Sequence, residues 1–322
     1  MRYEEIVQAK RRLSGVVHHT PLVHSKTFSE MAGGKTLLKL ENLQRTGAFK
    51  LRGAFNKVAS LAEGDRAKGI VTASAGNHAQ GVACAAAHYG VAATVVMPQS
   101  APAAKVNATE SYGAAVVLAG SNYDEAYAYA RQYADERGAT FVHAFDDAAV
   151  IAGQGTIGIE IVDECPDVDT IVVPIGGGGL IAGVALAAKA ANPAVRIVGV
   201  QPESANSAYL SWQTGRRLAI AAPATIADGL AVKSPGELPW AMMQRYVDDI
   251  VAVSDDEIVR AMRLHLERAK LLVEGAGAAP LAALLGGKIE TTGRQTALVV
   301  SGGNVDLTRL ALLAGIGDTV RA

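Results

Sequence analysis

The fold is decided by the stretch Pro174-Ile175-Gly176-Gly177-Gly178-Gly179-Leu180-Ile181. The apolar run over 170–175 predicts a buried strand, and the run from the glycines to about residue 191 predicts a helix. Glycines let backbone N–H groups approach an anion closely, and a helix N-terminus adds partial positive charge. The stretch therefore predicts a strand–loop–helix unit that binds a phosphate group.

The glycine spacing is not that of the two common nucleotide loops. In G-x-G-x-x-G register from Gly176, Ile181 stands at the third glycine position, and Gly34-Lys35-Thr36 ends like a Walker loop whose first glycine position holds Ser29. A tight turn that uses glycine only for conformational freedom is the structural alternative. We therefore expect a small phosphorylated cofactor rather than a dinucleotide.

Outward from the glycine run, apolar β-rich segments alternate with alanine-rich segments. Upstream, strands are predicted over 69–73, 92–97 and 114–118, and helices over 77–89, 102–112 and 122–137. Gly90, Gly113 and Gly138 follow these helices, as C-terminal stops often do. Downstream, strands are predicted over 170–175, 196–200, 249–253 and 296–300, a helix over 255–272, and loops over 216–240.

This alternation with short connections predicts an α/β protein with two domains, each a twisted, mostly parallel sheet flanked by helices. Residues 66–146 form the small domain, inserted into a large domain made of 1–65 and 147–322. Ligands in such folds bind at the carboxyl ends of the strands, so we expect the site in the cleft between the domains. The large domain is expected to bind the cofactor, and the small one to close over the substrate.

Composition excludes several classes of protein. Of the 322 residues 50% are hydrophobic and 19% charged, which is ample for a large core and excludes a disordered chain. The net charge of -1 leaves no basic surface for nucleic acid. Cys84 and Cys165 are too few for a disulfide framework, and the charged N-terminus is unlike a signal peptide. The uncharged stretch 170–188 contains Pro174 and the glycines, which argues against a membrane span, so we expect a cytoplasmic protein.

Lys50 is the candidate that could hold such a cofactor covalently. It follows a Gly-Ala-Phe turn and starts a predicted helix that runs to Leu61. Partial burial beside Phe49 and the positive end of the helix both lower the pKa of an amine, which favours the neutral form needed for a Schiff base. On this spacing alone, a solvated lysine is the alternative.

Five motifs occur in order and together resemble the threonine dehydratase and serine racemase family of pyridoxal-phosphate enzymes, of fold type II. The resemblance covers nearly the whole chain, from Thr20 to Asp306. The motifs are Ala48-Phe49-Lys50-Leu51-Arg52-Gly53, Ser74-Ala75-Gly76-Asn77-His78, the run Gly176 to Gly179, Glu274-Gly-Ala-Gly277 and Ser301-Gly302-Gly303-Asn304.

The resemblance implies a role for each matching residue. Lys50 forms the Schiff base and then removes the substrate Cα proton. The other cofactor-binding residues are Phe49 against the ring, Asn77 at the ring hydroxyl, Gly176, Gly177, Gly178 and Gly179 around the phosphate, and Ser301 at the pyridine nitrogen. The substrate-binding segment, which holds the carboxylate, comprises Ser74, Ala75, Gly76 and His78. Glu274 lies in a motif that approaches the cofactor, but no role follows for it. Helix capping is the structural alternative for Ser74 and Asn77.

Ser301 favours one reaction type. A hydroxyl cannot stabilise a protonated pyridine nitrogen as a carboxylate does, so the ring is a weaker electron sink and elimination is favoured over transamination. We therefore expect a lyase, a dehydratase (ammonia-lyase) that converts L-threonine or L-serine to 2-oxobutyrate or pyruvate plus ammonia. Another 3-hydroxy amino acid such as 3-hydroxyaspartate stays open as the substrate.

Two departures from the racemase branch narrow the function. That branch carries a serine at position 75 as its second acid–base group, and Ala75 cannot transfer a proton. The racemase branch also binds a divalent metal through two carboxylates, and the matching positions here hold Gln201 and Ser207. Hard cations prefer carboxylates, so we expect no divalent-metal site. A monovalent cation held by carbonyl groups stays open. No other metal site is predicted.

Rival functions are a serine racemase, a cysteine-synthase-like enzyme of β-replacement and a non-catalytic protein that binds an amino acid or the cofactor. The retained Lys50 and Ser301 argue against the last. The chain ends soon after the Ser301 motif, so we expect no appended regulatory domain and a catabolic type of dehydratase. The resemblance also implies a homodimer, with no nucleic-acid or membrane partner.

Overall fold

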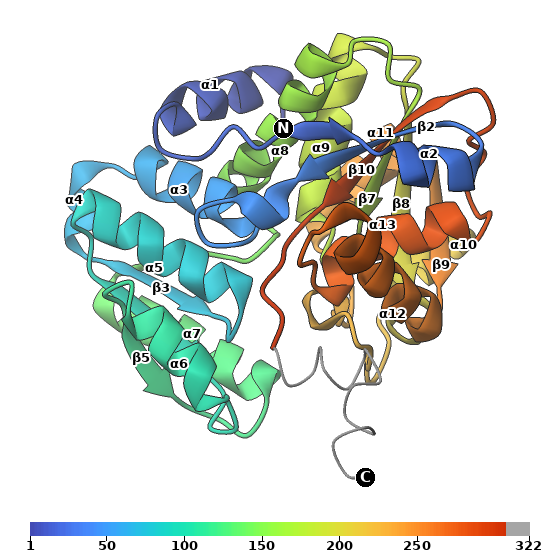
Figure 1. The fold of residues 1–322 in the computed structure, drawn as a ribbon. Coiled ribbons are helices and arrows are strands. Elements are labelled where there is room, and N and C mark those ends of the chain that lie inside the picture. Colours follow the sequence, from blue (N-terminus) through green and yellow to red (C-terminus); the bar gives the residue numbers. More distant parts are fainter. Residues whose placement is uncertain (307–322) are drawn as a thin grey trace, which may run out of the picture.

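Two sheets organise the chain, and the computed structural model describes residues 1–306 of it. The large sheet contains six strands and lies on the right of Figure 1, and the small sheet contains four and lies on the left. All pairings are parallel except that of β1 with β2. The prediction of an α/β protein with mostly parallel sheets is confirmed.

The large sheet is assembled from both ends of the described chain. Its spatial order is β1-β2-β10-β7-β8-β9, so the last strand in sequence lies between the second and the seventh. The strands are β1 (Leu22–His24), β2 (Lys35–Leu40), β7 (Thr170–Pro174), β8 (Arg196–Pro202), β9 (Asp249–Val253) and β10 (Gln295–Val300).

Alternate residues of each strand enter different cores because side chains point to opposite faces of a sheet. On β7, Val172 packs in one core with residues of α13, whereas Ile171 and Val173 pack in another with residues of α8 and α9. Each fully buried aliphatic side chain contributes roughly 1.5–3 kcal/mol. The helices of this part are α1 (Tyr3–Leu13), α2 (Lys26–Ala32), α8 (Ala148–Glu164), α9 (Gly179–Ala191), α10 (Ser207–Thr214), α11 (Glu237–Tyr246), α12 (Asp255–Leu264) and α13 (Gly275–Leu285).

The small sheet has the order β5-β4-β3-β6. Its strands are β3 (Ile70–Ala73), β4 (Ala93–Met97), β5 (Ala115–Leu118) and β6 (Thr140–Phe141). The helices around it are α3 (Lys50–Ser60), α4 (Glu63–Ala67), α5 (Asn77–Tyr89), α6 (Ala103–Glu110) and α7 (Tyr123–Arg137). Gly90 and Gly138 end α5 and α7 in the left-handed conformation, as predicted for these stops.

Two segments differ from the sequence prediction. The helix expected over 255–272 is regular only to Leu264, continues as the π-helical turn His265–Ala269, and ends at Lys270 with a positive φ of 61°. The expected loop region 216–240 contains the short helix η3 (Asp228–Leu230) and the start of α11. The remaining short helices are η1 (Glu41–Leu43) and η2 (Glu203–Ala205).

The uncharged stretch 170–188 is divided between β7 and α9, with the glycines between them. In the part of the chain that the structure describes, no helix has both the length and the apolar character that crossing a bilayer requires.

Candidate active site

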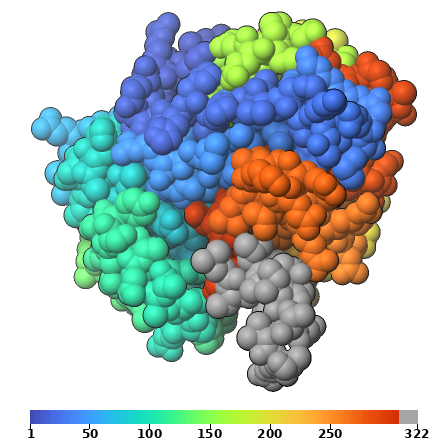
Figure 2. Space-filling view, viewed as in Figure 1, coloured from blue at the N-terminus to red at the C-terminus, as the bar shows by residue number. Residues whose placement is uncertain are grey.

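The predicted site segments follow the carboxyl ends of strands from both sheets. The glycine loop (residues 176–179) follows β7, Ser301 follows β10, and Ser74 follows β3. Figure 2 shows the red segment at the end of β10 at the border between the teal surface around the small sheet and the orange surface of the large one. The site is therefore built where the two sheets face each other, as expected for this type of fold.

The glycine loop is closed in on one side. A Cβ at Gly177 would overlap the Phe145 ring, and a Cβ at Gly179 would lie 2.7 Å from the Phe145 carbonyl oxygen. Gly178 has a φ of 91°, which disfavours any residue with a side chain, and it directly precedes α9. The first N–H groups of α9 have no acceptor within the helix. The loop therefore provides backbone donors at a helix N-terminus, as a phosphate requires.

Lys50 is held at the start of α3 by contacts on its preceding residues. Ala48 forms a β-bridge with Gly302, and the Phe49 N–H donates to the Ser301 carbonyl oxygen at 3.0 Å. The Lys50 Nζ donates to the Ala144 carbonyl oxygen at 2.7 Å and lies 5.2 Å from the centre of the Phe49 ring. Burial lowers the pKa of Lys50 to about 8, although the Glu274 carboxylate opposes this shift. The neutral amine needed for covalent chemistry is therefore accessible near neutral pH.

A chain of side chains links Asn77 to two of the other motifs. The Asn77 Nδ2 donates to Glu274 Oε1 at 2.8 Å, and the Asn304 Nδ2 donates to Asn77 Oδ1 at 2.9 Å. Burial raises the pKa of Glu274 to about 7. Glu274, which had no role from sequence, thus orients Asn77 and is itself a group that titrates near neutral pH.

The segment after β3 provides a second helix N-terminus. The Gly76 N–H donates to Ser74 Oγ at 3.2 Å, and α5 begins at Asn77. The His78 Nε2 lies 3.1 Å from the Val142 carbonyl oxygen, which can only accept, so Nε2 carries the proton. Burial, reinforced by Lys50, lowers the pKa of His78 to about 3. The buried Nδ1 has no hydrogen-bond partner among the described residues and is an acceptor, so it does not suit a carboxylate.

Sequence reasoning missed the His143 turn (residues 143–146). Its Ala144 carbonyl binds Lys50 and its Phe145 packs on the glycine loop, so the turn connects the two strongest predicted features. No local signal distinguishes the turn, because its partners lie more than 30 residues away on either side.

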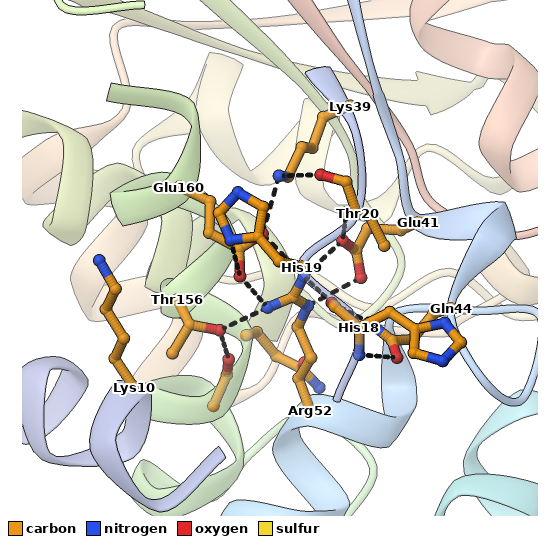
Figure 3. Close-up of polar contacts among 12 residues, drawn as sticks. Lys10, His18, His19, Thr20, Lys39, Glu41, Gln44, Arg52, Thr156 and Glu160 are labelled. Carbon is orange, nitrogen blue, oxygen red and sulfur yellow. Dashed lines mark hydrogen bonds and ion pairs between the residues drawn. The ribbon is translucent and has the colours of Figure 1, made fainter. Parts of the chain in front are cut away.

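An ionic cluster surrounds Arg52, which follows Lys50 by two residues on α3 (Figure 3). Arg52 Nε and Nη2 donate to the two oxygens of Glu41, each at 2.8 Å, and its Nη1 and Nη2 donate to the two oxygens of Glu160 at 2.6 and 2.9 Å. The Lys39 Nζ lies 2.7 Å from Glu160 and donates to the Thr20 carbonyl oxygen at 2.6 Å. The side chains of Arg52, Glu41 and Lys39 are 0% exposed.

The cluster pairs opposite charges. Arg52 bridges Glu41 and Glu160, and Lys39 contacts both Glu160 and the partly exposed Glu164. Burial opposes ionisation of both Arg52 and Glu160, but their mutual attraction prevails, so the pKa of Arg52 is raised and that of Glu160 is lowered. Arg52 and Glu160 are therefore held in their ionised forms, and the hydrogen bonds of Arg52 fix the first turn of α3, on which Lys50 stands.

Gln201 and Ser207 are engaged in hydrogen bonds within the protein. Gln201 Oε1 accepts from the N–H groups of Ala208 and Tyr209 at 2.8 and 2.9 Å, and its Nε2 donates to the Ile175 carbonyl oxygen at 3.2 Å. The Ser207 Oγ donates to a backbone carbonyl oxygen at 3.1 Å. Within residues 1–306, His, Cys, Asp and Glu side chains form no group that could hold a metal ion.

These features fit a phosphorylated aldehyde as the bound group. The glycine loop offers a cradle in which side chains would clash, and Lys50 offers an amine that burial makes reactive. The two are joined through the His143 turn. The fold and the site together define an enzyme class in which a lysine holds such a cofactor between two α/β units.

The chain belongs to the family of pyridoxal-phosphate dependent enzymes, whose model matches residues 13–302. An L-threonine ammonia-lyase from Thermotoga maritima is 50% identical over 307 residues, or 95% of this chain and 76% of that protein. The catabolic L-threonine dehydratase of Escherichia coli K12 is 46% identical over 317 residues, or 98% of this chain and 96% of that one. The structure of maize serine racemase matches with a TM-score of 0.93 and 38% identity, over 99% of this chain and 98% of that one.

Proposed function

We propose that this enzyme is an ammonia-lyase that converts L-threonine, and also L-serine, to the 2-oxo acid and ammonia. The observation that carries the chemistry is Lys50, whose buried amine has a pKa of about 8 and whose preceding residue, Phe49, donates its N–H to the Ser301 carbonyl oxygen. The two threonine lyases named above, identical at about half of their positions, support the choice of substrate.

Pyridoxal phosphate, when bound, supplies an aldehyde for the substrate amino group and an electron sink for the carbanion at Cα. We propose that Lys50 would hold the aldehyde covalently and that its unprotonated Nζ would take the proton from the substrate Cα. Asn77 would bind the ring hydroxyl, with Glu274 and Asn304 fixing the orientation of its amide. Phe49 would lie against the ring, Ser301 would face the pyridine nitrogen as a neutral partner, and the glycine loop would hold the phosphate.

The substrate carboxylate is proposed to bind at the N-terminus of α5. The N–H groups of the first turn and the Ser74 hydroxyl are donors there, and a helix N-terminus favours an anion. The His78 imidazole presents an acceptor rather than a donor, so His78 would contribute through its backbone N–H.

The remaining proposals concern assembly and closure. Residues 66–146 would move as a small domain over the substrate, against a large domain of residues 1–65 and 147–322. A homodimer, a monovalent cation held by carbonyl groups and a cytoplasmic location are also proposed. Gln201 and Ser207 lack the charge that a divalent cation prefers.

Serine racemase is the second candidate, supported by the likeness to the maize structure. Ala75 argues against it, because this position follows Ser74 directly at the N-terminus of α5 and carries no group that transfers a proton. We expect D-serine formation to be negligible beside elimination.

The test is 2-oxo acid release by the purified holoenzyme from L-threonine, L-serine, 3-hydroxyaspartate and D-serine. We expect turnover of L-threonine and L-serine, and a loss of at least about 10³-fold in the Lys50→Ala variant. Turnover of 3-hydroxyaspartate alone would mean that the proposed substrate is wrong, whereas the proposed elimination mechanism would still hold. Wild-type turnover by Lys50→Ala would refute the role of Lys50.

A further inference from the structure

The His143 turn is organised by one side chain. The His143 Nδ1 lies 3.2 Å from the N–H nitrogen of Phe145 and 2.8 Å from that of Asp146. Both backbone groups are donors, so Nδ1 accepts two hydrogen bonds and must be unprotonated. A neutral imidazole therefore substitutes here for the oxygen that usually organises such a turn, that of Asn or Asp.

Three contacts lead from this turn to the site. The Ala144 carbonyl oxygen accepts from Lys50 Nζ at 2.7 Å, and Phe145 packs against Gly177 and Gly179. The Asp146 carboxylate accepts from the N–H groups of Glu237 and Leu238 at 2.9 and 3.0 Å, and so caps α11.

The capped start of α11 is also hydrogen-bonded to the glycine loop. The Gly236 N–H, directly before α11, donates to the Gly177 carbonyl oxygen at 3.0 Å. The residue that carries the amine, the loop that holds the phosphate and the helix beside that loop therefore all depend on the shape of residues 143–146.

We propose that His143 is a positioning residue, whose unprotonated Nδ1 holds the turn that aligns Lys50 with the glycine loop. The proposal rests on the proposed role of Lys50. Because a proton on Nδ1 would remove both hydrogen bonds, acidification is expected to loosen the turn and with it the site.

The surroundings keep the imidazole neutral. Burial lowers the pKa of His143 and the Lys50 and Arg131 charges lower it further, whereas the carboxylates of Asp146 and Asp147 oppose the shift. The neutral imidazole of His78 also faces it. The aromatic rings packed against His143 belong to Phe145, Tyr127 and Phe141, with centres 4.6, 5.9 and 6.2 Å away.

The alternative is that His143 only fills space among these rings. Two variants separate the two roles. His143→Asn keeps an acceptor, because Asn Oδ1 binds the N–H groups two and three residues on in turns of this kind. His143→Leu has a side chain of suitable volume for packing and no acceptor.

The experiment measures pyridoxal-phosphate affinity of the apoenzyme by absorbance titration, and kcat of the holoenzyme from pH 5 to 9. We expect His143→Leu to bind the cofactor more weakly and to lose about tenfold or more in kcat, as a slightly misplaced catalytic group does. We expect His143→Asn to stay within about threefold of wild type, because it retains the acceptor. Its kcat should also fall less than that of the wild type at acid pH, since its amide does not titrate.

The proposal would be overturned if His143→Leu and His143→Asn had the same cofactor affinity and the same kcat, whether both match the wild type or both are impaired. A His143→Leu protein that fails to fold beside a folded, active His143→Asn protein supports it. Lys50→Ala is measured in parallel. Wild-type turnover by Lys50→Ala refutes the proposed function, whereas inactive Lys50→Ala with wild-type behaviour of His143→Leu refutes the role of His143 alone.

Discussion

Lys50 and Arg52 are two cations on the first turn of the same helix, and the structure treats them in opposite ways. Arg52 donates to two carboxylates through four hydrogen bonds and is completely buried (Figure 3). Lys50 is half-buried, and within the described residues its amine donates to a neutral carbonyl oxygen, that of Ala144. The pKa of Arg52 is raised, whereas that of Lys50 is lowered to about 8.

The difference between Arg52 and Lys50 distinguishes a residue that supports the helix from a residue that is proposed to take part in the reaction. A group that must give up its proton needs burial without a matched counter-charge, because the counter-charge would stabilise the ammonium form. A group that must stay fixed needs matched charges and saturated hydrogen bonds. Arg52 follows Lys50 by two residues, so the reactive amine stands on a turn of α3 that four charge-assisted hydrogen bonds hold in place.

Removing the fixed cation should have the largest effect on stability. Arg52→Met removes the cation that bridges the buried carboxylates of Glu41 and Glu160, and we expect a loss of about 3–5 kcal/mol in the free energy of unfolding. Urea denaturation of the apoenzyme measures it. Combining it with Glu41→Gln should recover part of the loss, because one uncompensated charge is then removed. A loss below about 1 kcal/mol in Arg52→Met would show that the cluster is not dry.

A change at Glu274 should alter the pKa of Lys50. Glu274 loses its proton as the pH rises through about 7, and its negative charge then favours the ammonium form of Lys50. In Glu274→Gln that charge is absent, so the pKa of Lys50 should fall below its value of about 8. The measurement is the pH dependence of Lys50 arylation in the apoenzyme, followed by peptide mass analysis. An unchanged or higher pKa would contradict the assigned coupling.

The smallest effect is expected at an exposed pair, which serves as the reference for the buried cluster. The Lys10 Nζ lies 2.6 Å from Asp163, but the two side chains are 45% and 59% exposed. Lys10→Ala should change the free energy of unfolding by at most about 0.5 kcal/mol, because solvent screens the attraction. Thermal denaturation of Lys10→Ala and Arg52→Met in parallel tests this difference between an exposed and a buried ion pair. A loss of stability in Lys10→Ala as large as that in Arg52→Met would contradict it.

The sequence allowed prediction of the features that depend on a local pattern or on motifs in a fixed order. The strand and helix periods, and stops such as Gly90 and Gly138, lie within single segments, so the elements that were predicted mostly correspond to observed ones. Lys50 and the glycine loop were proposed as site residues because the motifs are specific in combination. The assignment of roles to the individual site residues stays a prediction.

The features that sequence missed depend on partners far along the chain. The start of α11 is capped by Asp146, 91 residues before Glu237, so its own segment looked like a loop. The helix expected over 255–272 changes to a π-helical turn at His265, whose ring is 0% exposed and packs edge-on against Phe28. The cluster joins Arg52 to Glu160, 108 residues away, and nothing in either segment indicates the other.

The position of β10 has a consequence for biosynthesis. This strand, the last in the described chain, fills the gap between β2 and β7 and then delivers Ser301 and the Gly302 bridge to Ala48. Until the ribosome has released it, β2 and β7 each present an unpaired edge, which invites association with other nascent chains. We therefore expect cofactor binding to follow the synthesis of β10, and we expect a chain truncated before Gln295 to aggregate even though it already contains Lys50 and the glycine loop.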